Sequence, residues 1–184
     1  MPNLYVALVH YPVVNKNGDV ITSAITNLDL HDISRVAKTY GVKIFYVVTR
    51  LTDQIELAGR IIGHWTNGAG AQYNPARRKA LESIRIIESL EDVVSQIGER
   101  ERVQPKTVVT CARKFDAAIS YDKMRRLIGN GKPYLLVFGT AWGLAAETIR
   151  QADYILEPIA GRTGYNHLSV RSAASIILDR LVGR

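Results

Sequence analysis

The stretch that decides the fold is Tyr134–Arg184, which reads YLLVFGTAWGLAAETIRQADYILEPIAGRTGYNHLSVRSAASIILDRLVGR. Two short apolar runs, Tyr134–Phe138 and Tyr154–Leu156, have the length and composition of buried strands. Each run enters a glycine-bearing turn, Gly139–Gly143 or Pro158–Gly161, and a helix is expected after each turn. Ligands of parallel α/β sheets bind beyond the carboxyl ends of the strands. We therefore predict that these two strands are neighbours and that their turns form the binding site, with the opposite end of the chain uninvolved.

The rest of the chain alternates in the same way between strand and helix patterns. Strands are expected at Leu4–Val9, Val42–Val48, Ser83–Ile87 and Thr107–Ala112. Helices are expected after a cap at Thr26 or Asn27, over Leu51–Trp65 and Pro75–Leu81, from Ser89 to about Gly98, from Ser120 to Ile128, and at the carboxyl terminus. Polar or glycine-containing segments at Val13–Ser23, Thr66–Asn74 and Glu99–Lys106 are expected to be loops. This order predicts one α/β domain over residues 1–184, with a mostly parallel sheet and helices on both faces.

The position of the glycines excludes the commonest nucleotide-binding α/β folds. A Rossmann domain, like the common Rossmann-like methyltransferase fold, needs a glycine-rich turn after its first strand. That position here is His10–Val14, which contains no glycine. The P-loop pattern GxxxxGK[ST] is also absent from the sequence.

Charge and composition favour an anionic partner. The net charge of +7 makes nucleic acid the leading candidate, although a basic chain can also simply be more soluble. The single cysteine, Cys111, is predicted to be a buried strand residue and fits a reducing cytoplasm. We expect no signal peptide and no membrane span, because no apolar run is long enough. We expect no metal site, because the four histidines, His10, His31, His64 and His167, are scattered.

Three motifs, taken in order, resemble those of the SPOUT class of RNA methyltransferases, which have the α/β-knot fold. The first is the helix start Asp29–Arg35, in which Arg35 matches while Asp29 and His31 replace an asparagine and a glycine. The second is Leu135–Leu144, an apolar strand with a glycine turn, in which the glutamate of SpoU-type members is missing. The third joins Ile155–Gly161 to the helix start at His167.

The resemblance covers nearly the whole chain and carries several implications. Within the class, the chain is similar to small stand-alone bacterial members with an HWxxGxGxxYNPxR segment, here His64–Arg77. The fold would contain a C-terminal trefoil knot, and the protein would be a homodimer with its site near the subunit interface. The cofactor would be S-adenosylmethionine (SAM), and the substrate would be tRNA or rRNA, methylated on a ribose 2′-oxygen or a base nitrogen.

The resemblance also assigns candidate residues to the site. Arg35 would orient a phosphate or stabilise a deprotonating hydroxyl, and Asp29 would be a candidate base. The cofactor would be bound by residues of the two turns and of the last helix start, namely Phe138, Gly139, Thr140, Gly143, Leu144, Leu156, Pro158, Ile159, Gly161, His167, Leu168, Ser169 and Val170. The glycines also have a plain interpretation as turn residues, and first-turn aspartates commonly complement a helix dipole.

The segment around His64–Arg77 is predicted to be a substrate lid. His64, Trp65 and Tyr73 would stack on an unpaired base, and Arg77 and Arg78 would contact phosphates. The same residues would also be compatible with an ordinary solvated loop.

Two alternatives to an RNA methyltransferase remain open from the sequence. The first is a non-catalytic RNA-binding dimer that keeps the knot, which the departures from the SpoU pattern at Asp29, His31 and Trp142 allow. The second is an unrelated α/β enzyme that binds another nucleotide.

Overall fold

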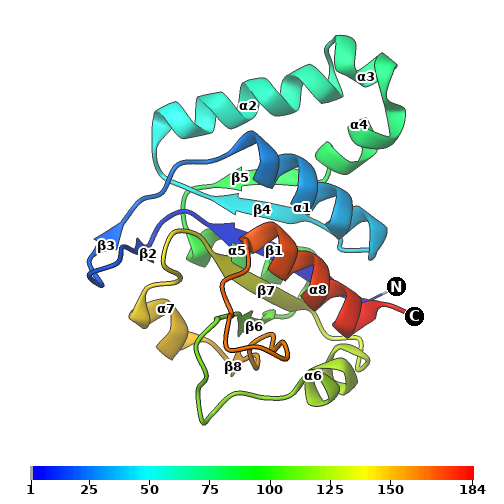
Figure 1. Cartoon of the computed structure of the whole chain (residues 1–184). Coiled ribbons are helices and arrows are strands. Elements are labelled where there is room, and N and C mark those ends of the chain that lie inside the picture. Colours follow the sequence, from blue (N-terminus) through cyan, green and yellow to red (C-terminus); the bar gives the residue numbers. More distant parts are fainter. Residues whose placement is uncertain (1) are drawn as a thin grey trace.

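The computed structural model describes residues 2–184, and a six-stranded sheet with strand order β5-β4-β1-β7-β6-β8 forms its centre (Figure 1). All neighbouring pairs in this sheet are parallel. The strands are β1 (Leu4–Val9), β4 (Phe45–Val48), β5 (Ile84–Ile87), β6 (Lys106–Val109), β7 (Tyr134–Gly139) and β8 (Tyr154–Ile155). The prediction of a mostly parallel α/β sheet is confirmed. The single-domain prediction for residues 1–184 includes Met1, which lies outside the described residues.

Helices cover both faces of the sheet, as predicted. One face is covered by α1 (Asn27–Thr39), α2 (Thr52–Thr66), α4 (Pro75–Leu81), α6 (Tyr121–Ile128) and α8 (Val170–Val182). The other face is covered by α5 (Leu90–Glu101) and α7 (Ala146–Gln151). The alternation of β1 divides the core between the two faces, because Leu4, Val6 and Leu8 lie in one apolar cluster and Tyr5, Ala7 and Val9 lie in the other.

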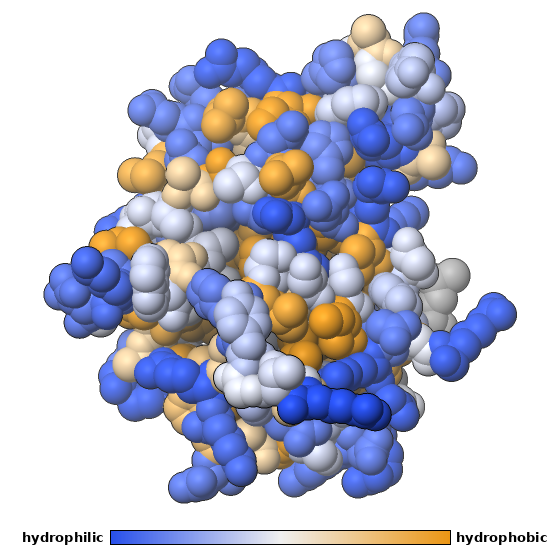
Figure 2. Space-filling model, in the orientation of Figure 1, coloured by the Kyte–Doolittle hydropathy of each residue, from blue (hydrophilic) through white to orange (hydrophobic). Residues whose placement is uncertain are grey.

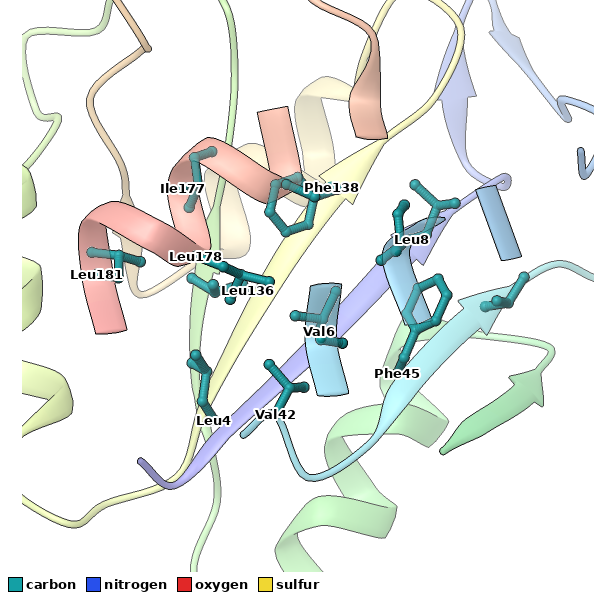
Figure 3. Packing of buried hydrophobic residues seen from close by; sticks show 14 of the residues in the cluster. Leu4, Val6, Leu8, Val42, Phe45, Leu136, Phe138, Ile177, Leu178 and Leu181 are labelled. Atoms are coloured by element: carbon teal, nitrogen blue, oxygen red, sulfur yellow. The ribbon is translucent and has the colours of Figure 1, made fainter. Parts of the chain in front are cut away.

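The last helix packs on the centre of the sheet. Ile177 and Leu178 of α8 lie against the β7 side chains Leu136 and Phe138 (Figure 3). The apolar side chains on one face of this helix are buried, with Ala174, Ile177, Leu178 and Leu181 at most 4% exposed. Burial of this helix therefore holds the C-terminal third of the chain against the middle strands.

Four segments differ from the sequence-based expectation. The segment Val13–Ser23 contains a short antiparallel hairpin, β2 (Val13–Val14) with β3 (Val20–Ile21), rather than only a loop. The segment Thr66–Asn74 contains the helix α3 (Ala69–Tyr73). Helix α5 continues to Glu101 instead of ending near Gly98. Strand β6 ends at Val109, so Cys111 lies beyond it and is half-buried rather than buried in a strand.

The two turns of the C-terminal stretch are also arranged differently. A helix, α7, follows the first turn closely, but no helix begins after Pro158–Gly161 until Val170. Strands β7 and β8 are not neighbours, because β6 pairs with both of them. Hydrophobic periodicity identifies strands but not their order in a sheet, which explains the error.

At the amino-terminal edge of the sheet, Glu101 organises a small polar cluster. Its carboxylate accepts hydrogen bonds from Asn3 Nδ2 (2.9 Å), the Tyr5 hydroxyl (2.5 Å) and Lys43 Nζ (2.7 Å), and its side chain is 15% exposed. The hydrogen bond from Lys43, followed by that from Tyr5, lowers the pKa of Glu101 to about 2. The charged carboxylate is therefore much more favourable in the folded than in the unfolded protein.

We expect Glu101→Gln to lower the free energy of unfolding at pH 7 by about 3 kcal/mol, because the pKa falls from 4.5 to about 2 on folding. A carboxyl group whose pKa is lower in the folded protein stabilises the fold at pH values above its pKa in the unfolded protein. This stabilisation is lost as the pH falls from about 4.5 through about 2. Urea unfolding at pH 7 and pH 3 measures the effect, with Glu99→Gln on the exposed side of the same helix as the control. If the difference in the free energy of unfolding between wild type and Glu101→Gln does not become smaller at pH 3, the stabilising role of the Glu101 carboxylate is contradicted.

Candidate functional site

The two glycine turns lie on either side of the carboxyl end of β6. The first turn follows β7 and the second follows β8, and both strands pair with β6. The segment after β6, residues 110–118, therefore lies between them, and Asn166 Nδ2 donates to Ala112 O (3.0 Å) across the gap. This segment was missed from the sequence because only the strand order, which the pattern does not encode, brings it to the site.

The first turn is tightly closed on itself. A Cβ added at Gly139 would lie 2.6 Å from Leu144 N and 2.9 Å from Gly143 C, so only glycine fits there without moving backbone. Gly143 has a φ of +114°, which side chains rarely adopt. Leu144 is 3% exposed and Trp142 is 68% exposed. The turn therefore buries one apolar side chain and displays another.

The amino-terminal hairpin holds this turn in place. Val14 N donates to Gly143 O and Trp142 N donates to Val14 O, both at 3.0 Å. Thr140 N donates to Val9 O at 3.3 Å, and Thr140 Oγ1 donates to the same oxygen at 3.0 Å. The expectation that the opposite end of the chain is uninvolved was wrong, because residues 9–14 form one hydrogen-bonded unit with the turn.

The second turn opens into a long exposed segment. Every residue from Ala160 to Ser169 is exposed, including Tyr165 and Leu168 at 71% and 41%. Among residues 2–184, no backbone N–H between Ile159 and Gly164 donates a hydrogen bond to the protein. A Cβ added at Gly161 or Gly164 would meet nothing within 4 Å. The chain's own packing therefore does not explain these glycines, and the backbone donors are free for a ligand.

These features fit a nucleoside cofactor. Such a ligand needs apolar walls with a few well-placed polar partners, which free backbone groups can supply. Leu144 and Leu156 are 3% and 1% exposed at the bases of the two turns, and Ile159 is half-buried beside them in sequence. The other predicted cofactor residues are distributed as follows: Phe138 is buried in the core, Thr140, Pro158 and Val170 are half-buried, and His167, Leu168 and Ser169 are exposed just before α8.

The predicted catalytic residues lie on α1, where this helix meets the start of α8. Asp29 is 5% exposed, and its carboxylate accepts from Thr26 Oγ1 (2.6 Å) and from Arg171 on α8 (3.0 Å). Arg171 also lies 3.4 Å from Asp32 Oδ2. Asp29 therefore fastens the two helix starts together.

Arg35 lies two turns of helix into α1 and is exposed. It lines a surface hollow between α1 and α8, together with Asp32, Thr39, Ser169, Arg171 and Ser172. Within the described part of the chain its guanidinium forms no ion pair. A free guanidinium among hydroxyl groups can bind a phosphate or stabilise a negative oxygen. A second hollow lies at the far ends of the same two helices, around Tyr40 and Gly183.

The predicted lid is a folded corner made of α2, α3 and α4. The guanidinium carbon of Arg77 lies 4.4 Å from the centre of the Trp65 ring, and His31 and His64 meet that ring edge-on. A Cβ at Gly70 would lie 2.7 Å from the same ring. Packing within the corner therefore accounts for much of the HWxxGxGxxYNPxR pattern, including its second glycine.

The other predicted substrate residues face outward from this corner. Tyr73 is 88% exposed, and Arg78 is paired with Glu82 at 2.7 Å. The corner follows the carboxyl end of α2 and precedes the start of β5, so it lies at the amino-terminal edge of the sheet (Figure 1). The structure thus separates His64, Trp65, Tyr73, Arg77 and Arg78 from the two glycine turns, which lie at the opposite edge.

Comparison with known proteins matches this fold and sequence to methyltransferases. The family model described as SAM-dependent RNA methyltransferase matches residues 3–183. A tRNA (guanine-N(1)-)-methyltransferase of Oleidesulfovibrio alaskensis is 44% identical over 181 residues, which are 98% of this chain and 42% of that protein. The chain thus spans less than half the length of this relative.

Solved structures of the same fold are more distant in sequence. TrmJ from Z. mobilis has a TM-score of 0.63 at 14% identity, covering 97% of this chain and 68% of its own. The TrmH/SpoU tRNA modifying enzyme of A. aeolicus has a TM-score of 0.57 at 18% identity, covering 98% and 74%. The SPOUT-like fold expected from the sequence is therefore confirmed.

Two expected absences concern residues 2–184 only. No helix in this range combines the length and apolarity that a membrane crossing requires. In the same range, no group of three or more acidic, histidine or cysteine side chains is arranged to hold a metal ion.

Proposed function

Because the chain belongs to the SAM-dependent RNA methyltransferase family, we propose that it binds SAM at the two glycine turns and methylates RNA. The observation that carries this proposal is the pair of turns beside β6, where buried leucines adjoin backbone donors with no partner in residues 2–184. The proposed cofactor residues are those named from the sequence, namely Phe138, Gly139, Thr140, Gly143, Leu144, Leu156, Pro158, Ile159, Gly161, His167, Leu168, Ser169 and Val170.

The protein's task at this site is to bind, orient and exclude water. When bound, SAM supplies a sulfonium-activated methyl group. Backbone N–H groups of Ile159–Gly164 would donate to the nucleoside, while Leu144 and Leu156 would form its apolar walls. Positioning of this kind supplies much of the rate enhancement in group transfer.

We assign Arg35 to the substrate side of the site. Its exposed guanidinium in the hollow between α1 and α8 would hold an RNA phosphate or stabilise charge that develops on the acceptor. Asp29 is less suited to act as the base, because Thr26 and Arg171 already occupy its carboxylate. We propose instead that Asp29 positions the start of α8.

The names of the relatives suggest a tRNA guanine N1 as the acceptor, and we propose it ahead of rRNA or a ribose 2′-oxygen. The corner would then contact RNA beside α1 and away from the two glycine turns, because Trp65 meets His31, one helical turn before Arg35. Tyr73 is the side chain there with a free ring for stacking, whereas Trp65 and Arg77 already contact each other. His64 and Arg78 would add polar and charged contacts.

We further propose a single domain with a C-terminal knot, forming a cytoplasmic homodimer. Apolar surface is visible along α2 and along α8 within otherwise hydrophilic surroundings (Figure 2). Exposed Leu28 on α1 and Leu168 before α8 add to it, at 57% and 41%. Surface of this kind favours association with a second copy near the site.

A methyl-transfer assay tests the proposal. The protein is incubated with tritium-labelled SAM and separate tRNA and rRNA pools, and the RNA is then digested to nucleosides. We expect label in tRNA as 1-methylguanosine. Label in another RNA or atom would refute the proposed acceptor, whereas SAM binding without any label would favour the non-catalytic alternative. Absence of SAM binding in calorimetry would contradict the proposed function itself.

A further inference from the structure

A chain of side-chain hydrogen bonds joins the first strand to the first glycine turn. His10, the residue after β1, lies 2.9 Å from Ser23 Oγ through its Nδ1 atom. Ser23 Oγ is in turn hydrogen-bonded to Thr140 Oγ1, which donates to Val9 O at 3.0 Å. His10 is 0% exposed, so the chain begins inside the protein and ends on the second residue of the turn.

The last acceptor, Val9 O, fixes the direction of every hydrogen bond in this series. Val9 O can only accept, so the Thr140 hydroxyl proton points to it. Ser23 must then donate to Thr140, and its oxygen is left to accept from His10 Nδ1–H. His10 therefore carries its proton on Nδ1, and burial lowers its pKa to about 4, so the ring stays neutral near pH 7.

This arrangement leaves one polar atom without a partner. In the Nδ1–H form, His10 Nε2 is an acceptor, and it is buried with no hydrogen-bond partner among residues 2–184. A buried acceptor without a partner destabilises a fold. Among residues 2–184, Ser23 Oγ is the one side-chain hydrogen-bond partner of the ring, and backbone groups of Ser23 and Ala24 lie close to it.

We propose that His10 and Ser23 are positioning residues for cofactor binding, acting through Thr140 on the turn Gly139–Leu144. The inference rests on the proposed function, because it assigns these residues to the same SAM site. Neither residue belongs to the two turns. Ser23 N also donates to His10 O at 2.9 Å, so the hairpin that carries Ser23 is anchored to the same strand end. The side-chain hydrogen bonds from His10 through Ser23 to Thr140, together with the backbone hydrogen bonds of the hairpin, set the shape of the turn.

Calorimetry with SAM on the full chain tests this inference. We expect Ser23→Ala to weaken SAM affinity about tenfold, because the buried His10 and the half-buried Thr140 each lose a hydrogen bond, while Ser23→Thr, which keeps the hydroxyl, restores it. Thr22→Ala is the matched control, since the Thr22 hydroxyl has no hydrogen bond among the described residues. In a double-mutant cycle with Thr140→Val, Ser23→Ala should have little further effect. Unchanged affinity in Ser23→Ala, or effects that simply add, would overturn the inference.

A second measurement separates this inference from the proposed function. The Thr140 and Trp142 amides donate to Val9 O and Val14 O, and the Gly143 amide donates to Thr140 O, so hydrogen exchange of these three amides reports the order of the turn without any ligand. We expect faster exchange at these amides in Ser23→Ala than in Thr22→Ala. If the wild type bound no SAM, the proposed function would fail, and unchanged exchange would still overturn the link between Ser23 and the turn.

Discussion

Arg35→Ala lowers the rate of methyl transfer by at least about 100-fold, the lower end of what one catalytic group contributes. The expected reason is the loss of a guanidinium that lies free in the hollow between α1 and α8. SAM affinity should be retained, because Arg35 is not part of either glycine turn. Single-turnover assays with labelled SAM, together with calorimetry on the same variant, measure the two quantities separately.

Lys38→Ala is the matched control for this experiment. Lys38 has the same charge, lies on the same helix and is exposed, but it belongs to the second hollow, away from the start of α8. We expect little change in its rate. The rate of methyl transfer should also stay low in Arg35→Lys, because lysine cannot form the two parallel hydrogen bonds that a guanidinium makes to a phosphate. Equal rates for wild type and Arg35→Ala would remove Arg35 from the mechanism.

Gly161→Ala weakens SAM affinity by at least about tenfold without changing thermal stability. A Cβ at this position meets no atom of the chain within 4 Å, and its φ is one that alanine can adopt. Any loss of affinity must therefore come from contact with the ligand, and forcing a methyl group into a packed contact commonly costs about 1–3 kcal/mol. Calorimetry and thermal unfolding of the same sample measure both effects.

Gly59→Ala serves as the control for that substitution, because its Cβ is equally free but Gly59 lies on α2, away from both turns. We expect wild-type affinity there. Equal SAM affinity in Gly161→Ala and wild type would show that the second turn does not contact the cofactor.

Local signals in the sequence predicted individual elements well. Helix Pro75–Leu81 was predicted to the residue, because proline occupies the first helical position after the Asn74 cap. The first helix is capped by Thr26, one of its two predicted caps, and the predicted helix starts at Ser89 and Ser120 were confirmed. Each of these side chains accepts from a backbone N–H three residues on. These features depend on neighbours in the chain, which sequence patterns record.

Features that depend on distant contacts were missed. The composition of the segment that forms helix α3 suggests a loop, because it contains Gly70. This glycine is needed for packing on Trp65. The insertion of β6 between β7 and β8 brings residues 110–118 to the site. The hydrogen bond between Ser23 and Thr140 of the first turn joins residues more than a hundred positions apart, and His10 is linked to the turn through Ser23. A signal for His10 existed, since it directly follows an apolar strand at the edge where ligands bind.

We propose that SAM binds beside β6, between the turns that follow β7 and β8. A crystal structure of the protein with S-adenosylhomocysteine tests it most directly. We expect a nucleoside hydrogen-bonded to backbone groups of residues 156–164 and in contact with Leu144. A nucleoside bound instead beyond β4 and β5, near Arg50, with residues 156–169 free of it, would contradict the account.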